Sequence, residues 1–82
     1  MLKTKTMSWN YRVLAHKHIG AVYFKIHEVY YNGEPDGYSE DGATIGAENL
    51  DDIRWKLDRM IEALAKPILM AGREFPNEYK EV

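Results

Sequence analysis

The residues best suited to chemistry are three histidines and one glutamate. His16 and His18 are separated by one residue, which is a spacing that two metal ligands can have, and His27 directly precedes Glu28, a possible acid–base pair. Adjacent residues of a strand point to opposite faces of a sheet, so His27 and Glu28 cannot act together on one substrate. We therefore rank an enzyme centred on His27 or Glu28 last among the functions considered, and predict that the protein is not an enzyme.

The three histidines are also not expected to converge on one metal ion. In the hairpin predicted below, His27 lies beside Asn10, about six residues from His16, which at ~3.3 Å per residue is roughly 20 Å. The chain has no cysteine, which excludes disulfides, thiolate metal sites and cysteine catalysis. The acidic stretch 34–41 lacks the spacing of a calcium loop, and the glycines form no phosphate-binding loop. We expect no metal and no cofactor.

Two β-strands that form a hairpin would position these residues. Residues 8–16 alternate in polarity, and residues 21–31 (AVYFKIHEVYY) are rich in aromatic and β-branched side chains, with Gly20 available for the turn between them. Pairing His16 with Ala21 makes every opposing pair on one face apolar. A slip of one residue would mix the two faces, whereas a slip of two would keep them.

The rest of the chain predicts a third strand and one helix. Residues 32–37 (NGEPDG) have turn composition, and residues 38–46 read as a weaker strand. Asn49 is a good N-cap for a helix that Pro67 would end. Apolar residues recur along this helix at spacings of three and four and would cover one face of the sheet: Leu50, Ile53, Leu57, Met60, Ile61 and Leu64.

The predicted fold class is therefore α+β, with two layers: a three-stranded antiparallel meander covered on one face by a single α-helix. We expect a disordered leader over residues 1–7, a β-β-β-α domain over 8–71 and a mobile C-terminal tail over 72–82. No apolar run approaches the roughly 20 residues that span a bilayer. A small domain without cysteines fits a reducing compartment, so we expect a cytoplasmic protein without a membrane partner.

Three segments carry a resemblance to a known family: Trp9–Val13 (WNYRV), Ile26–Tyr31 (IHEVYY) and Met60–Pro67 (MIEALAKP). They resemble a family of small uncharacterised bacterial and phage proteins, over about residues 9–69, and this resemblance implies no known activity. The β-β-β-α order is also similar to HicB-like antitoxin domains, which implies a partial double-stranded-RNA-binding-domain fold and a small protein partner. The connection between the predicted second and third strands is not of the antitoxin kind.

The face of the predicted hairpin that points away from the helix is unusually apolar and combines cations with tyrosines. Trp55 is a second unusual residue, because it falls on the polar side of the predicted helix, where it could also simply stack on Arg59. The predicted partner-binding residues are Arg12, Leu14, Tyr23, Lys25, His27, Val29, Tyr31 and Trp55. The alternative for the sheet face is that its tyrosines only stabilise cross-strand pairs.

These surfaces favour a non-enzymatic protein-interaction module that acts as a homo-oligomer or binds another small protein. The alternative function is nucleic-acid binding through Arg12, Lys25, Tyr23 and Tyr31, because aromatic and cationic side chains together can stack on bases and contact phosphates. The formal net charge of −2 disfavours this alternative, since phosphate contacts usually dominate such affinity.

Overall fold

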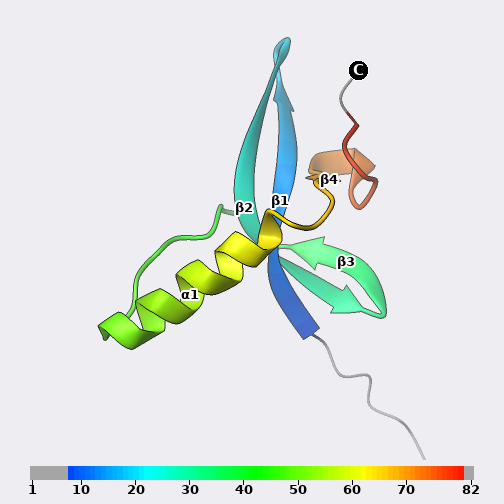
Figure 1. Ribbon diagram of the computed structural model, residues 1–82. Helices are drawn as coiled ribbons and strands as arrows, with labels where there is room; N and C mark the ends of the chain where they lie inside the picture. Colours follow the sequence, from blue (N-terminus) through cyan, green and yellow to red (C-terminus); the bar gives the residue numbers. More distant parts are fainter. Residues whose placement is uncertain (1–7, 81–82) are drawn as a thin grey trace, which may run out of the picture.

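The computed structural model describes residues 8–80 and builds them from four strands, one α-helix and one short 3₁₀-helix (Figure 1). The predicted leader, residues 1–7, lies outside the described residues, as do residues 81–82. The elements are β1 (Ser8–His18), β2 (Ala21–Asn32), β3 (Glu34–Tyr38), α1 (Leu50–Ala63), β4 (Leu69–Met70) and η1 (Gly72–Glu74).

The fold class is α+β, but the sheet differs from the prediction. It has four strands in the order β3-β2-β1-β4, and β4 runs parallel to β1, so the three-stranded antiparallel meander was wrong. Leu69 pairs with Leu14 and Met70 with Ala15, and the backbone N–H of Ala71 extends the pairing by donating to the Ala15 carbonyl at 3.0 Å. A strand of two residues has no recognisable period, which is why the sequence did not predict it.

The β1–β2 hairpin confirms the predicted assignment of faces, with the pairing shifted by two residues. Val13 pairs with Ile26, and His16 pairs with Tyr23 rather than with Ala21. The shift follows from the turn, which contains only Ile19 and Gly20, both at positive φ (37° and 73°). A two-residue turn with two positive φ angles matches the right-handed twist of its strands.

β3 begins earlier than predicted, because the turn at Asn32-Gly33 is tight. Gly33 adopts a φ of 84°, and the strand starts at Glu34, inside the stretch that we expected to be a loop. The pairing of β2 with β3 contains an irregularity between Tyr30 and Tyr31. Residues 39–49, most of the predicted third strand, form a connection that still places the Ala43 N–H 2.7 Å from the Ile26 carbonyl.

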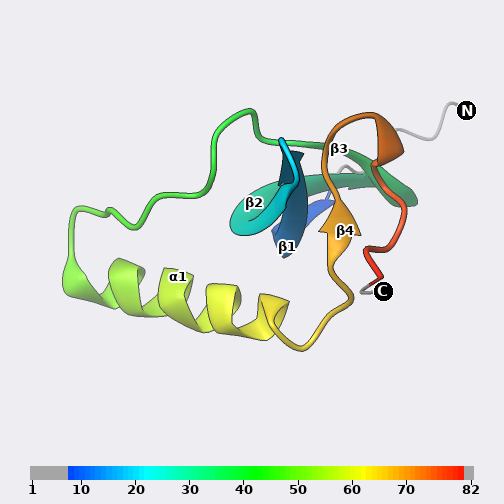
Figure 2. The ribbon, with the colours of Figure 1, turned by 90° about the horizontal axis from the view of Figure 1, so that it is seen from above.

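α1 begins where predicted and ends slightly earlier. Asn49 is the N-cap, and its side-chain oxygen accepts a hydrogen bond of 2.9 Å from the Asp52 N–H. The helix ends at Ala63 rather than Lys66, and the residues that follow form tighter turns, in which the N–H groups of Ala65 and Lys66 donate to the carbonyls three residues earlier. Its C-terminal half packs on β1, and its N-terminal half projects beyond the sheet (Figure 2).

The prediction that the whole apolar stripe of the helix covers the β2 face was therefore wrong. Among the six residues of that stripe only Met60 is buried, and it packs with Ala63, Tyr11 and Val13. A second core cluster, on the opposite face of the hairpin, contains Leu14, Val29 and Leu69.

Residues that follow β4, within the segment that we expected to be a mobile tail, pack over that second face. Phe75 packs against the second cluster and lies 4.8 Å from Tyr38, measured between ring centroids. The backbone fixes the segment as well, since the Met70 N–H donates to Asn77 and the Tyr79 N–H donates to Ile68, both at 2.7 Å.

The described part of the molecule is open in shape. Its Cα radius of gyration is 14.3 Å, whereas a compact domain of this length has one of about 11–12 Å. Among residues 8–80, no helix is both long enough and apolar enough to cross a membrane.

Candidate functional site

His16 and His27 lie side by side, although they are not opposite each other in the hairpin. His27 pairs with Arg12 and His16 with Tyr23, yet the two imidazole Nε2 atoms are 2.9 Å apart. The twist of the ribbon brings residues that are four positions off register together on this face, and Arg12 reaches Tyr31 in the same way. The predicted separation of roughly 20 Å was therefore wrong.

The hydrogen bonds of His27 define which ring nitrogen donates and which accepts in each imidazole. His27 Nδ1 lies 2.8 Å from the backbone carbonyl of Ser39, which can only accept, so Nδ1 carries the proton. In the neutral ring Nε2 is then an acceptor, and His16 donates to it from its own Nε2–H. Burial lowers the pKa of His16, and the nearby His27 and Lys25 lower this pKa further because a second positive charge is unfavourable beside them.

The hydrogen-bonding capacity of His27 is used within the fold. His27 is fully buried, and both of its ring nitrogens are occupied within the fold. Glu28 accepts a hydrogen bond from the Tyr30 hydroxyl at 3.1 Å. Within residues 8–80, no three His, Cys, Asp or Glu side chains are grouped closely enough to hold a metal ion.

The sheet face that we expected to bind a partner is largely covered by the chain itself. Leu14, His27 and Val29 are fully buried. Arg12 is 8% exposed and donates to the Tyr31 hydroxyl at 2.8 Å and to the Pro67 carbonyl at 2.6 Å. Most of the predicted partner-binding residues on this face are therefore buried, because β4 and the residues after it pack over it.

Two of the predicted partner-binding residues on this face remain accessible. Tyr23 is exposed and stacks on His16 with 5.0 Å between the ring centroids. The Lys25 ammonium lies 5.8 Å from the centre of the same tyrosine ring. They lie near the tip of the hairpin, and a binding role for these two residues stays a prediction.

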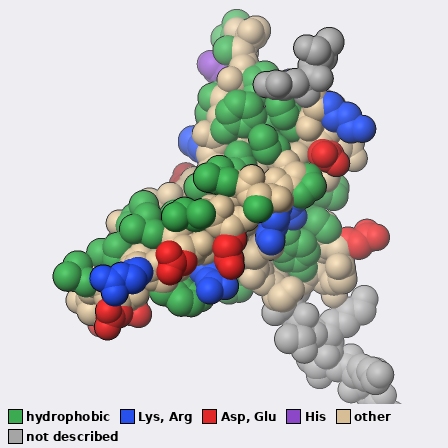
Figure 3. Space-filling model, viewed as in Figure 1, with side chains coloured by type: hydrophobic (Ala, Val, Ile, Leu, Met, Phe, Trp, Pro, Cys, Tyr) green, Lys and Arg blue, Asp and Glu red, His purple; other side chains and the backbone are tan. Residues whose placement is uncertain are grey.

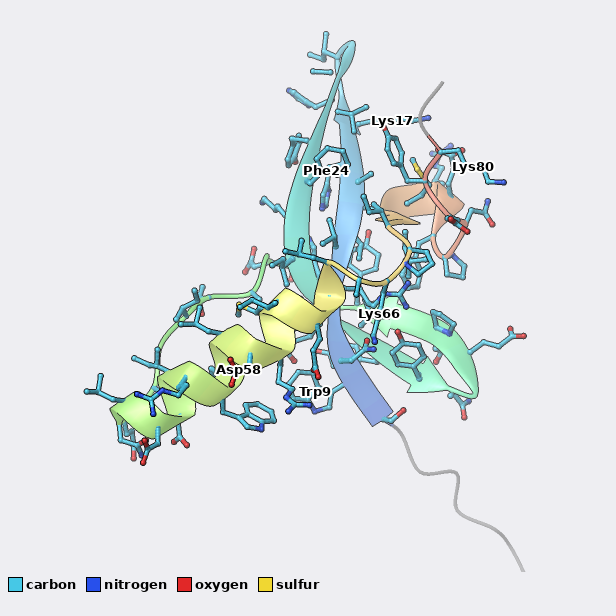
Figure 4. The ribbon with its side chains drawn as sticks, viewed as in Figure 1. Trp9, Lys17, Phe24, Asp58, Lys66 and Lys80 are labelled. Atoms are coloured by element: carbon cyan, nitrogen blue, oxygen red, sulfur yellow. The ribbon has the colours of Figure 1, made fainter. Side chains whose placement is uncertain are left out.

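Trp55 lies where the sequence placed it, on the polar side of α1. Arg59 stacks over its ring at 5.6 Å and also forms an ion pair of 3.1 Å with Glu62. A cavity of about 330 Å³ separates Trp55 from Trp9 at the start of β1. Figure 4 shows Trp9 beside the helix. The predicted stacking on Arg59 is confirmed, and the role of Trp55 as an anchor for a partner stays a prediction.

The most exposed aliphatic side chains of α1 and of its C-cap residue Leu64 form a stripe along one side of the helix. Leu50 is 78%, Ile61 is 63% and Leu64 is 71% exposed, and Leu57 is exposed as well. Phe24 of β2 is also exposed and lies on the same face of the molecule, above the helix in Figure 4. We call these five residues, Phe24, Leu50, Leu57, Ile61 and Leu64, the apolar patch. Figure 3 shows hydrophobic side chains along α1 and over the ribbon on this face.

The stripe is exposed because of how α1 is rotated about its axis. The helix touches the sheet through Met60 and Ala63. At 3.6 residues per turn, Leu50, Leu57 and Ile61 project in nearly the same direction from the helix axis. This direction is rotated by about 100° from the mean direction of Met60 and Ala63. α1 therefore rests on the edge of its apolar stripe and leaves the centre of the stripe in solvent.

The apolar patch is large enough for a protein interface. Taking roughly 100 Å² for each of its five side chains gives on the order of 500 Å². Interfaces of standard size bury about 800 Å² per partner, a little over half of it apolar, which is about 450 Å². The spacing of three and four residues identified this stripe in the sequence, but no local pattern indicated that the sheet would leave it uncovered.

Comparison of the chain with models of protein families, with curated proteins and with solved structures gives no match. The resemblances to a small bacterial and phage family and to HicB-like antitoxins therefore stay predictions.

Proposed function

We propose that this protein is a non-enzymatic interaction module that associates with further copies of itself through the apolar patch. The observation that carries this proposal is the exposure of Leu50, Ile61 and Leu64 along one side of a helix. Burying a large aliphatic side chain is worth about 1.5–3 kcal/mol, so leaving several of them in water favours association.

The edges of the sheet are less suitable for association than the patch. β3 is a short edge strand that contains Pro35 and begins with Glu34, and both features discourage pairing with another chain. β4 is followed by a segment that pairs back on it through Leu69 and Glu78. Nucleic-acid binding gains no support, because the guanidinium of Arg12 already donates to two acceptors within the fold.

Sedimentation equilibrium over a range of concentrations tests the proposal. The full chain is expected to associate reversibly, and Ile61→Ser is expected to weaken the association about tenfold or more, because the variant removes an exposed apolar side chain from the patch. Asp58→Ser, an exposed polar position of the same helix, is the matched control and is expected to leave the association unchanged. A chain that stays monomeric at its highest soluble concentration contradicts the proposal.

A further inference from the structure

The exposed stripe of α1 is symmetric about its own centre. In chain order it contains Leu50, Ile53, Leu57, Ile61 and the C-cap residue Leu64, with spacings of three, four, four and three residues; Ile53 is half-buried and the other four are exposed. Both the residue types and the spacings are therefore the same in either direction. A second α1 that runs antiparallel would place each residue beside one of its own kind, around a twofold axis at Leu57.

We infer that two copies of this chain pair through antiparallel α1 helices centred on Leu57. This inference rests on the proposed function and names the partner and its orientation. In this arrangement Leu50 meets Leu64 of the second copy, Ile53 meets Ile61, and Leu57 meets Leu57 across the axis. A parallel pair would also align apolar residues, so the choice between the two orientations depends on further features of the helix.

The unequal cover along α1 favours the antiparallel orientation. The C-terminal half of the helix lies on the sheet through Met60 and Ala63, whereas the N-terminal half, with Leu50, projects beyond it (Figures 1 and 2). An antiparallel partner brings its sheet-supported half beside the projecting half of the first copy. A parallel partner would instead leave both projecting halves together, without a sheet beside either of them.

Charge favours the same orientation. Glu48, Asp51 and Asp52 are exposed at the N-terminal end of α1, and Lys66 is exposed just beyond its C-terminal end. Antiparallel pairing places the acidic end of one helix near the basic end of the other, and it also aligns the two helix dipoles favourably. Parallel pairing would bring the two acidic ends together.

Single-cysteine variants of the full chain distinguish the orientations, because the protein has no cysteine of its own. A disulfide requires Cα atoms about 4.4–6.8 Å apart. In the antiparallel pair the two copies of residue 50 are separated by about 14 residues of helix, or roughly 21 Å, whereas residue 50 lies beside residue 64 of the partner. Leu57→Cys is expected to cross-link with itself under mild oxidation.

The deciding comparison uses Leu50→Cys and Leu64→Cys. Each variant alone is expected to stay uncrosslinked, and an equimolar mixture of the two is expected to form a covalent heterodimer. Arg73→Cys, an exposed position outside the patch, is the control for random collision. Rapid self-cross-linking of Leu50→Cys would overturn the antiparallel geometry.

The same samples separate this inference from the proposed function. If sedimentation shows a dimer but the Leu50→Cys and Leu64→Cys mixture cross-links no faster than the Arg73→Cys control, only the orientation is wrong. If sedimentation shows a monomer, the proposed function fails and the orientation fails with it. Circular dichroism of each variant establishes that the substitutions leave the helix content unchanged.

Discussion

The two faces of the β1–β2 ribbon are covered in different ways. One face carries Leu14, His27 and Val29 and is closed by β3, β4 and the residues that follow β4. The other face carries Tyr11 and Val13 and is covered in part, by the C-terminal half of α1 together with Ala43 and Ile68, while Tyr79 packs on Phe24 nearer the hairpin tip. The same two strands supply both faces. The difference in cover follows from the hydrogen-bond partners that the buried side chains of each face need.

The closed face buries polar groups that need particular partners. His27 requires an acceptor at Nδ1 and a donor at Nε2, and Arg12 requires acceptors for its guanidinium. Fixed groups of the same chain, such as the Ser39 and Pro67 carbonyls, meet these requirements. The face toward α1 holds Glu28, whose carboxylate accepts from the Tyr30 hydroxyl, but its cluster around Val13 and Met60 is apolar and makes no such directional demand, so a second molecule can complete its cover.

The largest expected difference between the two regions is in stability. Leu14→Ala is expected to lower the free energy of unfolding by about 2–5 kcal/mol, because Leu14 is fully buried. Leu64→Ala is expected to cost less than about 1 kcal/mol in a dilute, monomeric sample, because Leu64 is mostly exposed. Urea denaturation of both variants measures the difference. Equal losses would show that the two regions are packed alike.

A buried histidine provides the next test of the closed face. His27→Ala is expected to cost about 2–3 kcal/mol, because it leaves the Ser39 carbonyl without its donor and opens a cavity. His18→Ala, at the exposed end of β1, is the matched control, with an expected change close to zero. If both variants unfold at the same urea concentration as the original chain, the hydrogen bonds of His27 do not contribute to stability.

The turn that joins the two strands offers a stabilising change. Ile19 is 91% exposed and has a φ of 37°, which is unfavourable for a β-branched residue. Ile19→Asn is expected to raise the free energy of unfolding by about 1 kcal/mol, since Asn-Gly is the preferred sequence of such a turn. Thermal unfolding of this variant, with Ile19→Val as the control that keeps the β-branch, measures the gain. A lower melting temperature for Ile19→Asn than for Ile19→Val would contradict the turn geometry.

The pH dependence of stability should give the smallest effect. Burial and the neighbouring His27 and Lys25 lower the pKa of His16 in the folded state below its ordinary value of about 6.5. As the pH falls from 7 through this window, the unfolded chain binds a proton that the folded chain does not, so stability decreases. His16→Gln keeps a donor toward His27 and is expected to flatten this dependence. Identical slopes of urea midpoint against pH for both proteins would contradict the role of His16.

The parts of the fold that could be predicted from the sequence depend on local interactions. The Asn49 cap acts over three residues, Gly20 sets a two-residue turn, and strand alternation determines which residues share a face. The cover of the closed face could not be predicted in the same way. It depends on contacts such as that between Arg12 and Pro67, 55 residues apart, and on a strand too short to show a period.

For the candidate site, too, the local pattern could be predicted from the sequence and the long-range packing could not. The spacing of apolar residues identified the stripe on α1, whereas its exposure depends on the rotation of the helix against β1. The approach of His16 to His27 depends on the twist of the whole β1–β2 ribbon. A list of paired residues does not contain this twist, so the contact could not be predicted from the register.

Amide hydrogen exchange at two protein concentrations tests the contrast between the two regions most directly. The protein concentration is raised from below to well above the midpoint of association. We expect the exchange rates of the α1 amides, including those of its projecting half, to fall by about tenfold or more. The amides of residues 69–79 and of the β1 segment that they cover are expected to keep their rates. Equal exchange in α1 at both concentrations, or added protection confined to residues 69–79, would contradict association through the apolar patch.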